Sequence, residues 1–557
     1  MSQVTVETLS EDILLNVFRH LLAATPRFWP ILAKVCRRWK QIVFASPLGL
    51  NLRLYFRHRT PVLKSLDCWP VLPINIQYGG VQYIIPPSPS DDDNIIAALK
   101  QSSRINSISL TVTSSLLKKL SAISEPLLEL QELVLRSQDD RDRTLPSTFL
   151  WGPRLRILHL TRIAIPSFLP LLLTCQDLVE LQLHEFPGFG YFSPEAFANA
   201  LSGTPQLRSL TLQILSFPPG WSLLGLPPPP GERIVLAALT HFKYRGTSQY
   251  LDIFVARIDS PHLGDMNITF FHQRTMDASQ LGRFIERVEM HTSLTQADVQ
   301  TSAHAISISF TDSSDRTPLR IQISCKQLDL LLPCMAQVCD QISPFLSPVI
   351  ILGINAAQPF GRWDDVNSEQ WLDLLRSFKF SCAKSFWVAD KLTTAILGVL
   401  GPANEGNTAM LPSLCYVRVL KRIPMGGPLW DSVQSFITAR WISGRPIELT
   451  VLSYECHICD SSSTEPQELK LHLRNNHGYQ ILCSYCGKFE CTPEQSYLFR
   501  SHLQGKHPEI ARNDSLISKP SSTRIYLDNL VNRHGSLRAP DVVPSFPMSE
   551  STELHSQ

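Results

Sequence analysis

The sequence lacks the features by which several classes of protein are recognised. Its 51 Lys and Arg residues nearly balance its 49 Asp and Glu residues, and a net charge of +2 over 557 residues gives no field for nucleic acid or an anionic membrane. Its longest apolar segments, such as residues 168–173 and 349–352, fall far short of the ~20 residues of a membrane-spanning helix. No basic stretch followed by an apolar run stands at the N-terminus, so we expect no secretory signal and no membrane association.

Catalytic motifs and a disulfide pattern are also missing. The chain contains no Gly-x-Ser-x-Gly, no His-Glu-x-x-His and no phosphate loop, and Gly188 and Gly190 lack the third glycine of a dinucleotide-binding turn. We therefore expect a protein that is not an enzyme. The 13 cysteines are scattered except for a cluster from Cys456 to Cys491, which favours a reducing compartment with a metal site. The predicted location is the nucleus or the cytoplasm.

Apolar residues recur at helical spacing through the first forty residues. Thr8 and Ser10 are candidate N-caps, and Glu11 and Asp12 favour the positive end of the helix that follows. Two short amphipathic helices bury too little surface to be stable alone, so they need either the rest of the chain or another protein. The first apolar stripe consists of Leu9, Ile13, Leu14, Val17, Phe18 and Leu21, and the second of Leu32, Val35, Cys36, Trp39 and Ile42.

Residues 6–50 resemble the F-box, the module by which substrate receptors bind the Skp-type adaptor of a cullin-RING ubiquitin ligase. Two departures from the usual pattern are Ser10 in place of proline and a longer connector at residues 23–29. A helical hairpin packed on its own domain is the alternative interpretation. The resemblance implies that the adaptor is bound by Leu9, Ile13, Leu14, Val17, Phe18, Leu21, Val35, Cys36 and Trp39.

A degenerate repeat follows a predicted linker region at residues 51–94. The pattern Leu-x-x-Leu-x-Leu, with Ile at two positions of the first copy, begins at Ile105, Leu130, Leu155, Leu178 and Leu207. Looser copies with other apolar residues begin at Leu239 and Leu263, and the steps between first positions are 25, 25, 23, 29, 32 and 24 residues. These steps lie near the period of leucine-rich repeats, in which each unit contributes one short parallel strand and a returning segment. The alternation places two side chains of each strand in the core and the residue between them on a concave face that binds proteins.

The predicted repeat domain spans residues 95–450. Later apolar fragments, such as residues 306–310, 349–352 and 447–451, are interpreted as drifted repeats, and an α/β domain with several leucine-rich strands is the alternative. An F-box followed by leucine-rich repeats is the arrangement of a ubiquitin-ligase substrate receptor, and the stretch after residue 60 resembles fungal proteins of this kind. The expected fold is therefore α/β, with a helical F-box, an irregular leucine-rich-repeat-like solenoid and C-terminal tandem ββα zinc fingers.

Residues 451–510 contain two sets of Cys and His at the spacing of zinc fingers. Zinc requires four ligands at tetrahedral corners, and two Cys with two His about one helical turn apart supply them. The first set is regular, whereas the second has a longer loop, and Cys491 competes as a ligand there. We predict two zinc ions, held by Cys456, Cys459, His472 and His477 and by Cys483, Cys486, His502 and His507.

Binding of DNA by the two predicted fingers is the rival hypothesis for the function of the chain. The base-reading positions would be Glu465, Glu468 and Leu471 in the first finger and Gln495, Leu498 and Ser501 in the second. Glutamate repels phosphate and leucine offers no hydrogen bond to a base edge, so the pattern disfavours nucleic acid and favours a protein-binding or structural role. Residues 511–557, rich in Ser, Pro and charge, are predicted to be a disordered tail.

Overall fold

A computed structural model of the chain divides into two units. The first contains residues 1–386, 394–415 and 432–447, and the second contains residues 387–393, 416–431 and 448–557. The structure describes residues 9–47, 49–57, 62–68, 72–78, 89–123, 125–139, 144–145, 152–166, 168–185, 192–214, 232–271, 273, 276–289, 293–314, 316–325, 327, 330–342, 349–356, 368–380, 382–388, 392, 396, 411–419, 436–437, 440, 444–451, 454–455, 462–463, 480–483, 490–491, 506 and 535–538.

The first unit begins with a group of short helices. These are α1 (Glu11–Ala24), η2 (Pro26–Phe28), α2 (Trp29–Val35) and α3 (Arg37–Ala45). The prediction of a single second helix is wrong, because Cys36 adopts an extended conformation with φ −156° and ψ 170°. Its Sγ accepts a hydrogen bond from the amide of Trp39 at 3.4 Å and so caps α3. The second apolar stripe is therefore divided between two helices.

A large, mostly parallel sheet makes up the rest of the first unit, and this arrangement confirms the predicted α/β class. Its strands lie in the order β1-β2-β3-β4-β5-β6-β7-β9-β11-β14-β13-β12-β15-β16. The strands are β1 (Leu54–Phe56), β2 (Ile74–Tyr78), β3 (Ile105–Val112), β4 (Glu132–Ser137), β5 (Ile157–Thr161), β6 (Glu180–His184), β7 (Ser209–Gln213), β9 (His241–Gly246), β11 (Asp265–Phe271), β12 (Leu294–Ser302), β13 (Ala305–Asp312), β14 (Leu319–Ser324), β15 (Ile351–Ala356) and β16 (Ser385–Val388). A short parallel pair, β8 (Ile234–Val235) and β10 (Ile258–Asp259), lies apart from it.

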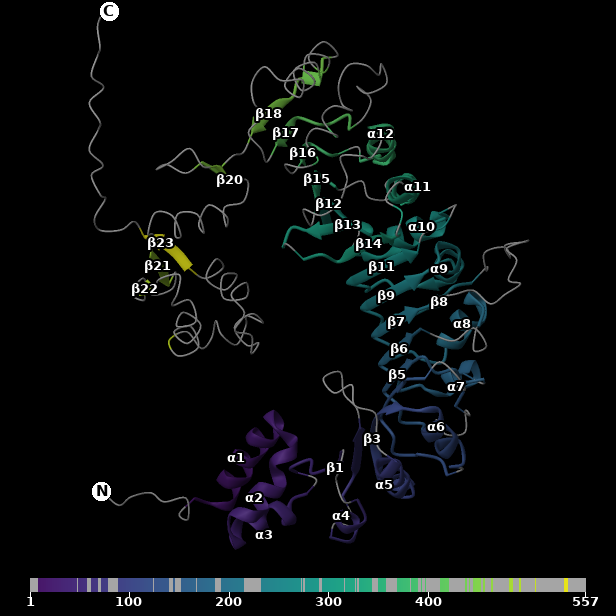
Figure 1. Ribbon diagram of the computed structural model, residues 1–557, viewed down its shortest axis with the longest axis vertical. Helices are drawn as coiled ribbons and strands as arrows, with labels where there is room; N and C mark the ends of the chain where they lie inside the picture. The colour runs from purple at the N-terminus through teal and green to yellow at the C-terminus, as the bar shows by residue number, and fades with distance from the viewer. Residues whose placement is uncertain are drawn as a thin grey trace, which may run out of the picture. The chain divides into compact units, whose positions relative to one another are not determined.

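Helices return the chain between many of these strands. In Figure 1, helices α6 to α11 lie along one side of strands β3 to β14. The helices of this unit are α4 (Val62–Cys68), α5 (Pro89–Leu99), η3 (Ser102–Arg104), α6 (Ser114–Ser121), α7 (Phe168–Thr174), α8 (Pro194–Leu201), α9 (Ser248–Val255), α10 (Ser279–Arg287), α11 (Leu331–Ile342) and α12 (Ser368–Ser377). Parallel strands require such crossovers, because a tight turn cannot join their ends.

The leucine alternation fixes which face of each strand is buried. Leu133 and Leu135 of β4 are fully buried, and Leu133 lies opposite Leu158 of β5 in the parallel register. The same register aligns Leu158 with Leu181 of β6. Because side chains alternate along a strand, the residues between the leucines point to the opposite, polar face. Rows of buried leucine on one face therefore run across β4 to β7, and the opposite face carries a row of Val134, His159, Gln182 and Thr211.

The sheet begins earlier in the chain than the sequence predicts. Within residues 51–94, predicted as a linker region, β1 pairs in parallel with β2, and β2 pairs in parallel with β3. Ile74, Ile76 and Tyr78 alternate toward the core and are almost completely buried. The Pro- and Asp-rich composition of this segment conceals two short strands, which have too few residues to show a clear period.

One predicted drifted repeat is an antiparallel hairpin instead. Residues 306–310 lie in β13, which pairs antiparallel with both β12 and β14. Only Ala303 and His304 separate β12 from β13, and a two-residue connection cannot return the chain for a parallel strand. The interpretation of this fragment as another repeat of the parallel series is therefore wrong.

The second unit contains short strands in the part that the structure describes. Strand β17 (Tyr416–Val419) pairs in parallel with β18 (Glu448–Val451). Two antiparallel hairpins follow, formed by β19 (Tyr454–Glu455) with β20 (Ser462–Ser463) and by β21 (Gln480–Cys483) with β22 (Glu490–Cys491). The other edge of β21 pairs with β23 (Gly535–Arg538), so these four residues of the predicted disordered tail form a strand. An open strand edge offers unpaired amides and carbonyls that such a strand satisfies.

None of the helices in the described ranges is long and apolar enough to cross a membrane.

Candidate docking surface on the N-terminal helices

The N-terminal helices enclose a small apolar interior. Phe18 of α1 is fully buried, and its ring meets the Trp39 ring edge-on with centroids 4.7 Å apart. Trp29 is buried as well and packs edge-on against Phe44 at 6.3 Å. The buried apolar residues of this interior are Leu14, Phe18, Leu22, Trp29, Leu32, Ile42 and Val43. Two of the residues predicted to bind a partner, Leu14 and Phe18, thus support the helices from inside.

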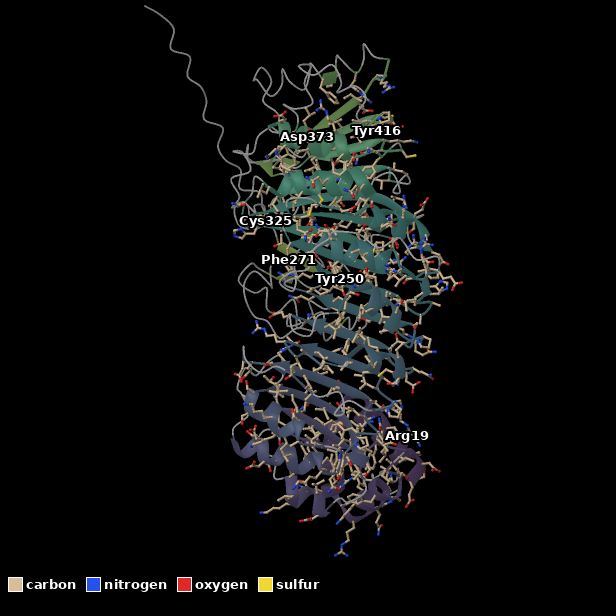
Figure 2. All side chains as sticks on the ribbon, turned by 90° about the vertical axis from the view of Figure 1, so that its right-hand side faces the viewer. Arg19, Tyr250, Phe271, Cys325, Asp373 and Tyr416 are labelled. Carbon is tan, nitrogen blue, oxygen red and sulfur yellow. The ribbon has the colours of Figure 1, made fainter. Side chains whose placement is uncertain are left out.

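Hydrogen bonds fix the ends of these helices and join them to the sheet. The Ser10 hydroxyl accepts from the amide of Ile13 at 3.4 Å, which confirms the predicted N-cap of α1. At the other end, the Thr25 hydroxyl donates to the Leu21 carbonyl at 2.9 Å. The indole of Trp29 donates to the carbonyl of Arg53 at 2.8 Å, and Arg19, labelled in Figure 2, donates to the carbonyl of Gly49 at 3.3 Å.

The outer side of the same helices exposes two apolar stripes. Ile13, Val17 and Leu21 recur every four residues along α1, and their exposed fractions are 48%, 43% and 47%. Phe28, Ile31 and Val35 form a second stripe on η2 and α2, with exposed fractions of 51%, 55% and 56%. We call these six residues the apolar docking surface. Twelve large apolar side chains are exposed among the described residues, and half of them belong to this short segment.

The predicted partner-binding residues divide between the interior and this surface. Ile13, Val17, Leu21 and Val35 lie on the apolar docking surface, and Cys36 is exposed beside it. Leu9 and Trp39 are half-buried. Sequence reasoning missed Phe28 and Ile31, although their spacing with Val35 matches one face of a helix. Phe28 was missed because residues 23–29 look like a connector, whereas η2 and the first residue of α2 lie there. Ile31 was missed because the predicted stripe of the second helix begins at Leu32.

A second candidate surface is the polar face of the sheet. The register aligns Arg136, Thr161, His184, Gln213 and Arg245 in one row across β4, β5, β6, β7 and β9, and no member of the row is acidic. This row contributes to the lining of a pocket of about 330 Å³ near the carboxyl ends of β4 to β7. The row therefore presents side chains that can form hydrogen bonds, while Glu132 and Glu180 lie elsewhere on the same face.

Two unusual backbone positions occur in this pocket. Arg162 and Glu185 follow directly after β5 and β6, with φ of 59° and 51°, a left-handed conformation that residues other than glycine rarely adopt. Their side chains form an ion pair across the strand ends. The His184 ring nitrogens lie 3.1 Å from the Gln213 Oε1 and 3.2 Å from the Gln182 Oε1. Strained positions of this kind are found at binding sites, where the surrounding structure holds them in place.

The predicted zinc ligands lie outside the described residues, apart from the backbone of Cys483 at the end of β21. In the sequence, the first Cys-x-x-Cys pair falls between β19 and β20, and the second begins at the end of β21 and precedes β22. Each pair is therefore flanked by the strands of an antiparallel hairpin. Two Cys in the turn of a hairpin, with two His further along, fit the donor set that zinc prefers.

A scan against models of protein families finds no match for this chain, and a search of the curated proteins finds no similar protein.

Proposed function

We propose that the chain is a substrate-receptor subunit of an SCF-type cullin-RING ubiquitin ligase, with a function in recruitment and no catalytic activity of its own. Residues 6–50 would act as the F-box and bind a Skp-type adaptor, which in turn binds the cullin. The observation that carries the proposal is the apolar docking surface, since six exposed apolar side chains lie on helices whose inner faces are already packed. Several large exposed apolar side chains gathered in one short segment are typical of protein–protein interfaces.

The parallel part of the sheet would hold the protein to be ubiquitinated. Strands at the predicted repeat positions, β3 to β7 with β9 and β11, pair in parallel and turn polar residues to one face, which supports interpreting them as degenerate leucine-rich repeats. The mechanism would be proximity, because a bound substrate has a high effective concentration near the loaded conjugating enzyme. The chain would work in the nucleus or the cytoplasm.

Binding of purified adaptor to the full chain tests the docking role. Val17→Asp with Ile31→Asp places two carboxylates on the apolar docking surface, and we expect adaptor affinity to fall at least about 100-fold because buried unpaired charge is costly at an interface. Leu128→Asp with Leu173→Asp is the matched control, because these leucines are exposed to 52% and 51% on other parts of the chain. Equal loss in both variants, or no binding by the wild-type chain, contradicts the proposal.

We also propose that the second unit binds two zinc ions through the Cys and His residues predicted above. The two hairpins that flank the Cys-x-x-Cys pairs support this assignment. When bound, zinc would supply folding energy, because such small units have too little core to fold without it. Metal analysis of the full chain should find two zinc per chain, falling toward one in Cys483→Ser. A content near zero in the wild-type chain contradicts the assignment.

A further inference from the structure

A second pocket lies where the N-terminal helices meet the first strand of the sheet. Its volume is about 610 Å³, and helices α2 and α3 form one wall while the region of β1 forms the other. Its basic and half-buried aromatic lining residues include Lys34, Lys40, Phe44, Arg53, Tyr55 and Arg57. Among the described residues that line it, four are basic and none is acidic, although the chain as a whole is almost neutral.

The wall formed by the region of β1 carries side chains that alternate between two faces. Leu54 and Phe56 are 5% and 1% exposed and point into the core. Side chains of a strand alternate between its faces, so Arg53, Tyr55 and Arg57 share the other face. The pocket is lined by these three residues and also by Leu54 and Phe56. The result is a basic, an aromatic and a basic side chain in one line at the edge strand of the described sheet.

Three of the four basic side chains in this pocket have no carboxylate among the described residues to neutralise them. Lys34, Lys40 and Arg53 form no ion pair with any carboxylate in the described part of the chain. The guanidinium of Arg53 donates instead to two neutral amide oxygens, that of Asn51 at 3.2 Å and that of Asn106. These bonds orient the group and leave its positive charge in place.

The opposite wall adds the other two charges and a second ring. Lys34 and Lys40 are exposed on α2 and α3, so their ammonium groups are mobile and hydrated, as is usual for lysine. Phe44 is half-buried in the same pocket. The indole of Trp29 donates to the carbonyl of Arg53 at 2.8 Å and ties the two walls together.

The combination of charge and rings defines a ligand class. Each phosphate group of a ligand carries roughly one to two negative charges near neutral pH, so a chain of phosphates matches several cations gathered in one pocket. Guanidinium binds phosphate through paired hydrogen bonds, and ammonium binds it as a point charge. Aromatic faces stack with a planar base. A volume of about 610 Å³ lies within the range of ~300–1,000 Å³ that is typical of small-ligand sites.

We propose that this pocket binds a nucleoside polyphosphate, with its phosphates at Lys34, Lys40 and Arg53 and its base against Phe44 and Tyr55. Its described lining residues include no carboxylate, so the proposed contacts are those of basic groups with phosphates and of aromatic rings with a base. The proposal is independent of the ubiquitin-ligase role. It concerns the inner side of the junction, whereas adaptor binding is assigned to the apolar docking surface.

Titration calorimetry of the full chain with ATP, GTP and inorganic tripolyphosphate tests the proposal. We expect the wild-type chain to bind ATP or GTP with a Kd that increases as the salt concentration is raised. Lys34→Gln with Lys40→Gln should weaken binding at least tenfold. Lys100→Gln with Lys384→Gln removes the same charge from exposed positions elsewhere and should leave the Kd unchanged.

Comparison of the ligands tests the role of the rings. Tripolyphosphate should bind with a higher Kd than ATP. Tyr55→Leu should reduce the ratio of the two Kd values. Equal Kd values for tripolyphosphate and ATP would overturn the assignment of the base to the aromatic wall. Absence of nucleotide binding at millimolar concentration, or an equal loss in the Lys100/Lys384 control, would overturn the site itself. Val17→Asp with Ile31→Asp should not change the nucleotide Kd, so this test and the adaptor test fail separately.

Discussion

The N-terminal helices and the parallel strands use similar apolar residues in opposite ways. In strands β4 to β6 each leucine of the repeat is covered, and Leu133, Leu158 and Leu181 have no exposed surface. On α1 and α2 the apolar residues divide between an interior led by Phe18 and an exposed surface that includes Ile13 and Ile31. The comparison shows that a helix can have two apolar sides, one packed in the interior and one left exposed.

The largest expected effect contrasts the two sides of α1. Phe18→Ala removes a fully buried ring that packs on Trp39 and should destabilise the N-terminal helices by about 4 kcal/mol. Ile13→Ala, at a residue that is 48% exposed, should cost less than about 1 kcal/mol. Hydrogen exchange of the α1 amides in the full chain measures both. Similar losses would mean that the two sides of the helix do not differ as described.

A buried carboxylate tests the interior on the sheet side of the comparison. Burial first, and the nearby Asp277 second, raise the pKa of Asp252 from 3.8 to about 6, although the amides of Gln280 and Leu281 donate to it. The folded chain therefore holds a proton that the unfolded chain releases between pH 4 and 6. This extra proton on Asp252 contributes up to about 3 kcal/mol to the free energy of unfolding. The contribution is fully present below about pH 4 and is lost as the pH rises through 6.

Asp252→Asn removes this titration while it keeps an amide oxygen for the backbone donors. We expect the melting temperature of the variant to rise relative to that of the wild-type chain as the pH increases from 4 to 7. Asp265→Asn, at an exposed carboxylate of β11, is the control and should show no such change. A difference that is constant with pH would show that Asp252 does not titrate in this range.

The smallest expected effect concerns the N-caps of two helices, one among the N-terminal helices and one beside the sheet. Ser10 caps α1, and Thr113 caps α6 by accepting from the Leu116 amide at 3.2 Å. Ser10→Ala and Thr113→Ala should each cost about 1 kcal/mol. Hydrogen exchange should place the first loss in α1 and the second in α6 and its neighbouring strands. Exchange that changes in the other region after either substitution would contradict the separation of the two regions.

Periodicity predicted the parts of the fold that repeat. The alternation of Leu or another apolar residue at two positions located β3 to β7, β9 and β11, because each strand buries the same two positions against its neighbours. Periodicity failed where a local contact decides the chain direction. The side chain of Cys36 caps α3 and divides the second helix, and the Ala303–His304 turn reverses β13. Helix α5 begins at Pro89, inside the predicted linker region, with Asp91 and Asp92 in its first turn.

The candidate sites followed the same rule. The apolar stripe of α1 was predictable because it repeats every four residues, whereas its division into buried and exposed sides required the packing of Phe18 against Trp39. The basic pocket was missed altogether. Arg53, Tyr55 and Arg57 alternate over only one short strand, and the lysines that complete the pocket stand on helices in another part of the sequence.

The most direct test of the docking account is hydrogen exchange of the full chain with and without purified Skp-type adaptor. The account predicts protection of α1, η2 and α2, which carry the apolar docking surface, and no change in α7, where Leu173 is exposed to a similar degree. It also predicts that Val17→Asp with Ile31→Asp abolishes this protection. Protection confined to other elements, or none at an adaptor concentration of tens of micromolar, would contradict adaptor binding by the apolar docking surface.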